Sequence, residues 1–95
     1  MKEDRLIEGS LIMKMKVIDA VLTGKRIQKM CRDKGLKVTD IQYALQLGSS
    51  QSVYKWFSEK SSSIPSLDHL VMLGILLDCY IDDMLVLKDI PPDNL

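Results

Sequence analysis

The feature that most constrains the fold is a series of short apolar stripes at helical spacing, separated by residues that start or stop helices. These stripes predict five short helices, at about 24–34, 38–45, 50–58, 67–77 and 81–87. No convincing pair of strands accompanies them, except for a strand-like pattern near the N-terminus. We therefore predict an all-α fold, and 95 residues are enough for one compact domain with its own core.

Capping and turn residues set the predicted helix boundaries. Gly35 supplies the left-handed residue that ends the first helix, and Pro91-Pro92 ends the ordered chain. Asp68, Asp82 and Asp83 lie at the positive ends of the last two helices. The candidate N-caps are Thr23 for the first helix, a Thr39/Gln42 capping box for the second, Ser49 or Ser50 for the third, and Ser66 for the fourth.

The N-terminal residues carry two conflicting patterns. Met13 to Val17 alternates like a strand, whereas Leu11, Met15, Ile18 and Leu22 keep helical spacing. A strand, a helix and a disordered arm are all compatible with this segment, and so is a strand exchanged between subunits. We therefore divide the chain into an N-terminal extension (1–22), a domain (23–88) and a C-terminal tail (89–95).

The third predicted helix has two chemically different faces. In "SSQSVYKWF", Val53, Trp56 and Phe57 share one apolar face. The opposite face carries polar side chains, which suit either solvent or a nucleic acid: Ser50, Gln51, Tyr54 and Lys55.

Charge is unevenly distributed although the net charge is zero. Residues 24–60 hold eight basic and three acidic side chains, whereas residues 61–95 hold one basic and six acidic. A phosphate-facing surface requires a basic region of this kind, so the zero total does not exclude a nucleic-acid partner.

The order of these segments resembles the helix-turn-helix family of the phage repressor and Cro type, also called the XRE (xenobiotic response element) family. The resemblance covers about Ile18 to Val86. It is carried by "TGKRIQKMCRDKGL", "VTDIQYALQLGSSQSVYKWF" and "IPSLDHLVMLGILLDCYIDDML". It implies a compact five-helix, lambda-repressor-like helix-turn-helix domain whose third helix enters the major groove of double-stranded DNA.

The resemblance also implies site residues. Gln51 can pair with adenine and Lys55 with guanine at the edge facing the bases, where Ser50 also lies. Phosphate contacts are implied for residues on and beside this helix and at the start of the second: Ser49, Ser52, Tyr54, Lys37, Thr39 and Lys60.

Within the range of the resemblance, the sequence departs from the family pattern in three places. Lys37 and Val38 stand where the second helix usually begins with a capping Ser or Thr followed by Gln. Gln46 stands where the turn usually has Gly, with Gly48 two residues later. The family's usual Gly-Lys pair is missing from the loop after the third helix, which has extra serines.

The fourth predicted helix is apolar all round. Leu70, Leu73, Gly74 and Leu77 suit the core, which would turn a second set of side chains outward: Met72, Ile75 and Leu76. A homodimer contact explains such a surface, and cover by the N-terminal segment is the alternative.

Other functional classes find little support in the sequence. Cys31 and Cys79 suit buried thiols rather than a disulfide or metal pair, and His69 suits a surface or capping role. No catalytic motif is evident, so we expect no enzyme activity, no cofactor and no metal. The absence of an apolar membrane span and of a cleavable leader favours a cytoplasmic protein that does not contact membranes.

Together these observations predict a sequence-specific DNA-binding transcriptional regulator, such as a repressor, acting as a homodimer. The alternative is a protein-interaction module on the same fold, such as an antitoxin or an adaptor.

Overall fold

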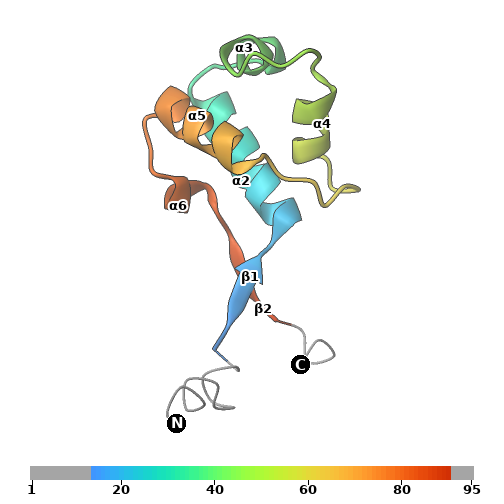
Figure 1. The fold of residues 1–95 in the computed structure, drawn as a ribbon, viewed down its shortest axis with the longest axis vertical. Helices are drawn as coiled ribbons and strands as arrows, with labels where there is room; N and C mark the ends of the chain where they lie inside the picture. Colours follow the sequence, from blue (N-terminus) through green and yellow to red (C-terminus); the bar gives the residue numbers. More distant parts are fainter. Residues whose placement is uncertain (1–13, 91–95) are drawn as a thin grey trace.

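The computed structural model describes residues 14–90. Five helices and two strands follow one another in this part of the chain (Figure 1). In chain order they are β1 (Lys16–Ile18), α2 (Ala20–Asp33), α3 (Val38–Ala44), α4 (Gln51–Phe57), α5 (Leu67–Leu77), α6 (Ile81–Met84) and β2 (Leu87–Asp89). The patterns at Leu11 and Met13, and the chain end expected at Pro91-Pro92, lie outside the described residues.

The fold is mostly helical, with the five helices predicted, and a small antiparallel sheet of two strands is added to them. Ile18 pairs with Leu87 and Lys16 with Asp89, and the Lys16 ammonium lies 2.6 Å from the Asp89 carboxylate. The pairing confirms the strand alternative for residues 16–18. It also explains why the last helix ends at Met84 rather than near residue 87: the chain becomes extended at Leu85 and enters β2.

The first helix begins earlier than expected. Asp19 is its N-cap, and the Asp19 carboxylate accepts a hydrogen bond from the Leu22 N–H at 3.0 Å. The prediction that Thr23 caps this helix is wrong, because Thr23 lies fully buried within α2. Its hydroxyl oxygen instead accepts a hydrogen bond from the Val86 N–H at 2.9 Å. This bond joins α2 to the segment that leads into β2.

The other helix ends follow local chemistry. Gly35 has a φ of 75° after α2, and Ser66 accepts a hydrogen bond from the His69 N–H at 3.2 Å at the start of α5, as expected. The prediction of a capping box formed by Thr39 and Gln42 is wrong. At the start of α3 the Asp40 carboxylate instead accepts a hydrogen bond from the Lys37 N–H at 2.7 Å, because α3 begins at Val38 and places Asp40 in its first turn.

One continuous core connects the helices. Its buried apolar members include the side chains expected from the α4 and α5 patterns: Val53, Trp56, Phe57, Leu70, Leu73 and Leu77. Ile27 and Cys31 of α2, Ile41 and Leu45 at α3, and Met84 of α6 complete it. The two strands extend away from this helical body in Figure 1, and all six strand residues are exposed.

Candidate nucleic-acid interface

Helix α4 is held firmly by its apolar side. Val53, Trp56 and Phe57 are all buried. The Trp56 ring also lies beside the His69 ring, with 5.7 Å between ring centroids. Since α2, α3 and α5 all contribute to the same core, the orientation of α4 is determined by contacts from several helices.

The opposite side of α4 is available to a partner. Gln51, Ser52, Tyr54 and Lys55 are exposed, and Ser50 is half-buried. The sequence therefore assigned the two faces of this helix correctly. The exposed face combines an amide, hydroxyls and an ammonium group, which are the donor and acceptor types used on base edges and phosphates.

Of the two alternative capping serines at the start of α4, Ser49 and not Ser50 accepts a hydrogen bond through its side chain. The Ser49 hydroxyl oxygen accepts a hydrogen bond from the Gln51 N–H at 3.3 Å. Ser50 is the residue before the helix, yet its side chain makes no capping hydrogen bond. The Ser50 hydroxyl therefore makes no hydrogen bond to the backbone at the start of α4 and can form one with a partner.

The remaining expected phosphate contacts lie on segments flanking α4. Lys37 and Thr39 are exposed at the start of α3, which packs against α4. Lys60 is exposed in the turn after α4, where its N–H donates to the Ser58 hydroxyl oxygen at 3.1 Å. Thus these three side chains are accessible on the two elements that adjoin α4 in sequence.

The connection between α3 and α4 contains an unusual backbone conformation. Gln46 has a φ of 57°, the left-handed region that glycine adopts most easily. The Leu47 N–H donates to the Gln42 carbonyl oxygen at 3.0 Å and closes this turn. The turn therefore has a conformation typical of glycine at Gln46, although this residue is a glutamine.

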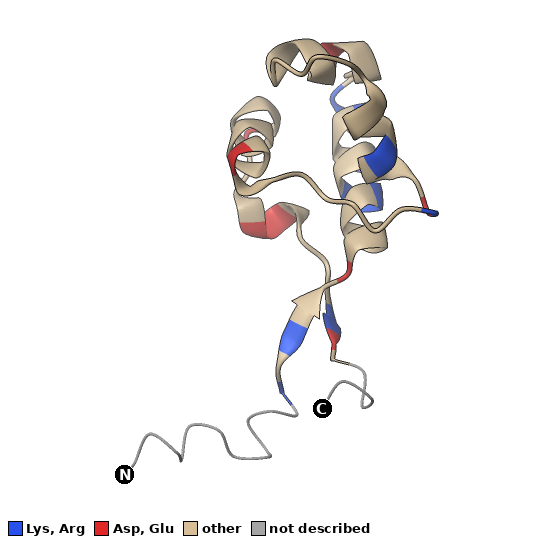
Figure 2. Cartoon of the chain, turned by 45° about the vertical axis from the view of Figure 1, so that its right-hand side comes forward, with Lys and Arg blue, Asp and Glu red and all other residues tan. Residues whose placement is uncertain are grey.

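Basic and acidic residues are unevenly distributed. In Figure 2, aspartates gather at the end of α5 and on α6, whereas lysines and arginines lie on α2, near α4 and on the two strands. Acidic residues also lie among the basic ones, as at Asp40 on α3 and Glu59 beside Lys60. Two lysines of α2 pair with acids: Lys25 with Glu59 at 3.5 Å and Lys29 with Asp33 at 3.0 Å. Within residues 14–90, Lys37, Lys55 and Lys60 form no ion pair, so they can bind phosphates without breaking one.

The exposed surface of α5 differs from the expected one. Met72 and Leu76 are half-buried and pack against the core, so the prediction that they face outward with Ile75 is wrong. Ile75 is 77% exposed, and it continues a row formed by Leu67 and Val71. Residues 67, 71 and 75 are four apart and share a face. Because Met72 and Leu76 pack against the core, α5 is oriented so that Leu67, Val71 and Ile75 face the solvent.

The thiols of Cys31 and Cys79 and the imidazole of His69 are buried or half-buried in the fold. Cys31 and Cys79 are both free, and Cys31 is buried, whereas Cys79 is half-buried. Burial raises the pKa of the Cys31 thiol to about 11, with a further contribution from Cys79. His69 is half-buried against Trp56. Among residues 14–90, no group of three or more His, Cys, Asp or Glu side chains is arranged to hold a metal ion.

Comparison with protein-family models, curated proteins and solved structures finds no match for the chain. Within the described part of the chain, every helix is too short or too polar to cross a membrane.

Proposed function

We propose that the protein is a sequence-specific double-stranded DNA-binding transcriptional regulator of the helix-turn-helix type. The observation that supports this most is the division of α4 into a buried apolar face and an exposed polar face. A helix used to read bases must be rigid and must present side chains that hydrogen-bond to base edges. Val53 and Trp56 supply the first property, and Gln51 and Lys55 supply the second.

In this proposal the polar residues have separate roles. Ser50, Gln51 and Lys55 contact bases, with the Gln51 amide suited to adenine and the Lys55 ammonium to guanine. Ser49, Ser52 and Tyr54 contact phosphates, together with Lys37, Thr39 and Lys60 on the flanking segments. The uneven distribution of charge supports these roles, since Lys37, Lys55 and Lys60 lie on or beside α4 without an ion pair among residues 14–90, and the cluster of aspartates lies at the end of α5 and on α6.

The proposal includes action as a cytoplasmic homodimer that represses transcription by occupying its site. Two copies on adjacent half-sites would double the contacts made by one short helix and raise both affinity and specificity. Of the three side chains first expected at the dimer contact, only Ile75 is exposed.

The direct experiment selects binding sites from random duplex DNA at two salt concentrations. We expect wild-type protein to enrich a defined, preferably palindromic site, and the Gln51→Ala/Lys55→Ala double variant to lose it. Lys88→Ala is the matched control because Lys88 is an exposed lysine on β2, outside the proposed interface. Enrichment of the same site by the double variant, with its melting temperature unchanged, would show that α4 does not read the DNA.

A second function is favoured by the exposed row on α5. One face of α5 is buried in the core. The other face exposes three apolar side chains to solvent: Leu67, Val71 and Ile75. A protein-interaction module on the same fold, such as an antitoxin or an adaptor, would use this row. The two functions are separable, because DNA binding weakens steeply with salt and depends on α4, whereas protein binding depends on Ile75.

A further inference from the structure

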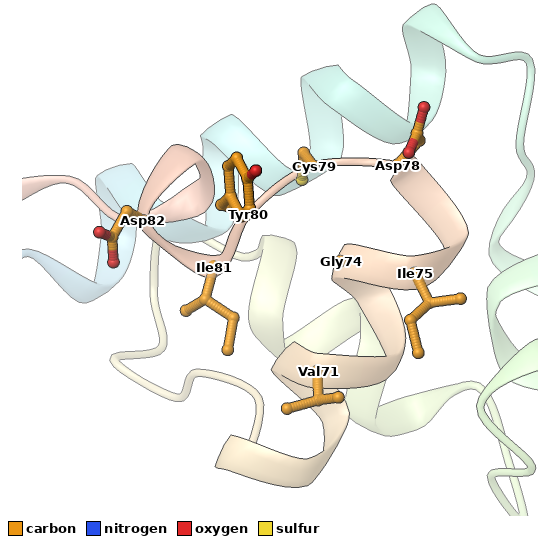
Figure 3. A pocket seen from close by; sticks show the side chains of 8 residues that line it. All are labelled: Val71, Gly74, Ile75, Asp78, Cys79, Tyr80, Ile81 and Asp82. Atoms are coloured by element: carbon orange, nitrogen blue, oxygen red, sulfur yellow. The ribbon is translucent and has the colours of Figure 1, made fainter.

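The α5–α6 groove is an open, mostly apolar depression at the C-terminal end of α5. It is formed by the last turns of α5, the linker that follows and the start of α6 (Figure 3). Its lining residues are Val71, Gly74, Ile75, Asp78, Cys79, Tyr80, Ile81 and Asp82. Ile75 and Ile81 extend in the same direction from the two helices, toward the side of α5 on which Val71 lies (Figure 3).

The apolar groups of this groove are unusually accessible. Ile75 is 77% exposed and Tyr80 is 82% exposed, although both are large side chains. Leu67, also 77% exposed, lengthens the apolar row along α5. From Leu67 to Ile75 this row extends about 12 Å, at 1.5 Å per helical residue. A partner with two turns of helix can therefore contact the whole row.

The backbone around the groove is well defined. Asp78 adopts a left-handed conformation at the end of α5, with a φ of 54°, and the Cys79 N–H donates to the Gly74 carbonyl oxygen at 2.9 Å. A Cβ added to Gly74 would lie 3.0 Å from the Cys79 carbonyl oxygen, so the linker passes close to α5. The backbone of the groove is therefore held in place by these contacts, and the exposed side chains of Ile75 and Tyr80 project from it.

Negative charge borders the apolar floor. Asp78 and Asp82 line the groove, and the lining set contains no lysine or arginine among the described residues. Asp83 lies next to it, where its carboxylate accepts a hydrogen bond from the Tyr80 N–H at 2.9 Å. The C-terminal carbonyl groups of α5 add negative potential at the same end. A positively charged partner is therefore favoured here.

We propose that the α5–α6 groove binds an amphipathic segment of another protein, with aliphatic side chains on one face and lysines or arginines beside it. The aliphatic face would cover Val71, Ile75 and Ile81, which lie toward the same side in Figure 3, and the basic groups would pair with Asp78 and Asp82. A symmetric contact between two copies is disfavoured because it sets this surface against itself and brings like charges together. The proposal extends the protein-binding function and holds whether or not α4 binds DNA.

The test uses the full-length protein and a fluorescein-labelled synthetic peptide of about four helical turns. The peptide carries Leu at i, i+3, i+4 and i+7 and Lys at the flanking positions, and a second peptide replaces each Lys by Glu. Fluorescence anisotropy should give a Kd at least about tenfold lower for the Lys peptide, and this preference should shrink as salt is raised.

Two groove variants locate the binding. Ile75→Ser should weaken the Lys peptide by about tenfold or more through lost apolar contact, and Asp78→Asn/Asp82→Asn should remove the preference for Lys over Glu. Asn is suited to the left-handed backbone at position 78, so this variant preserves the turn. Leu87→Ser is the control, since Leu87 is an exposed apolar residue of β2.

Either of two results would overturn the proposal. The first is that wild type binds the Lys peptide and the Glu peptide with the same Kd, and that Ile75→Ser leaves both Kd values unchanged. This would mean that the groove recognises neither the basic groups nor the aliphatic face. The second is a wild-type dimer in sedimentation that Ile75→Ser converts to a monomer, which would make a second copy the occupant. In the site-selection assay the Asp78→Asn/Asp82→Asn variant should enrich the same DNA site as wild type, so failure of peptide binding and failure of DNA binding are distinguished.

Discussion

Gly24 of α2 lies directly against the backbone of Trp56 in α4. A Cβ placed on Gly24 would lie 1.8 Å from the Trp56 carbonyl oxygen and 3.0 Å from its carbonyl carbon. Glycine is therefore required for this approach of the two helices. Because Trp56 belongs to the buried face of α4, the contact helps to determine where the exposed face, with Gln51 and Lys55, is presented.

Gly24→Ala should destabilise the protein by about 1–3 kcal/mol or more, since the clash is with backbone and no side-chain rotation relieves it. In an ordinary helix the same substitution stabilises by roughly 0.5–1 kcal/mol, so the sign of the change reports the contact. The free energy of unfolding in urea measures it. Gly48→Ala is the matched control because nothing lies within 4 Å of the added Cβ, and equal effects of the two variants would contradict the contact.

Thr23→Val should lower the free energy of unfolding by about 1–3 kcal/mol, because it leaves the part-buried Val86 N–H without its acceptor. The substitution keeps the shape of a side chain that is 0% exposed. Thermal unfolding measures the loss, and faster hydrogen exchange of the Val86 amide would locate it. Thr39→Val, at an exposed position of α3, should change stability much less.

Ser66→Ala should cost about 1 kcal/mol of stability, because α5 loses the hydroxyl that accepts from the His69 N–H. Urea unfolding of this variant is to be compared with that of Ser50→Ala. Ser50 precedes α4 but its side chain makes no capping bond, so its replacement should cost less. A larger loss for Ser50→Ala would mean that the caps are assigned wrongly.

Lys60→Gln should lessen the salt dependence of DNA binding under the proposed function. Because the proposal places Lys60 on a phosphate, its loss should reduce the slope of log K against log salt in magnitude by about 0.9. Gln51→Ala, at a base contact, should leave the slope unchanged and relax the preference at one base pair. Binding titrations on the selected duplex at several salt concentrations separate these outcomes, and an unchanged slope for Lys60→Gln would remove Lys60 from the phosphate contacts.

The Cys31 thiol should make stability fall in alkaline solution. Burial raises its pKa from 9.0 to about 11, so the unfolded chain loses this proton first as pH rises. The contribution to the free energy of unfolding is therefore fully present below about pH 9 and declines between pH 9 and 11. Cys31→Ala should show a smaller decline than wild type over this window, although its absolute stability is lower. Parallel pH curves for the two proteins would contradict the assignment.

Local patterns in the sequence determined most of the helical fold. The i, i+3, i+4 spacing of Val53, Trp56 and Phe57 identified the buried face of α4, and the same reasoning placed Leu70, Leu73 and Leu77 in the core. Gly35 and Ser66 marked helix ends because their effects depend on backbone groups only a few residues away. The polar face of α4 followed from these assignments.

Only the tertiary structure decided features that depend on residues far apart in the chain. The strand at Lys16–Ile18 exists because it pairs with Leu87–Asp89, and that pairing also ends α6 early and gives Thr23 a partner at Val86. The half-burial of Met72 and Leu76, and with it the exposure of Val71, depends on how α5 rotates against the other helices. Periodicity states that a helix has an apolar face, whereas packing decides which residues at its edge are covered.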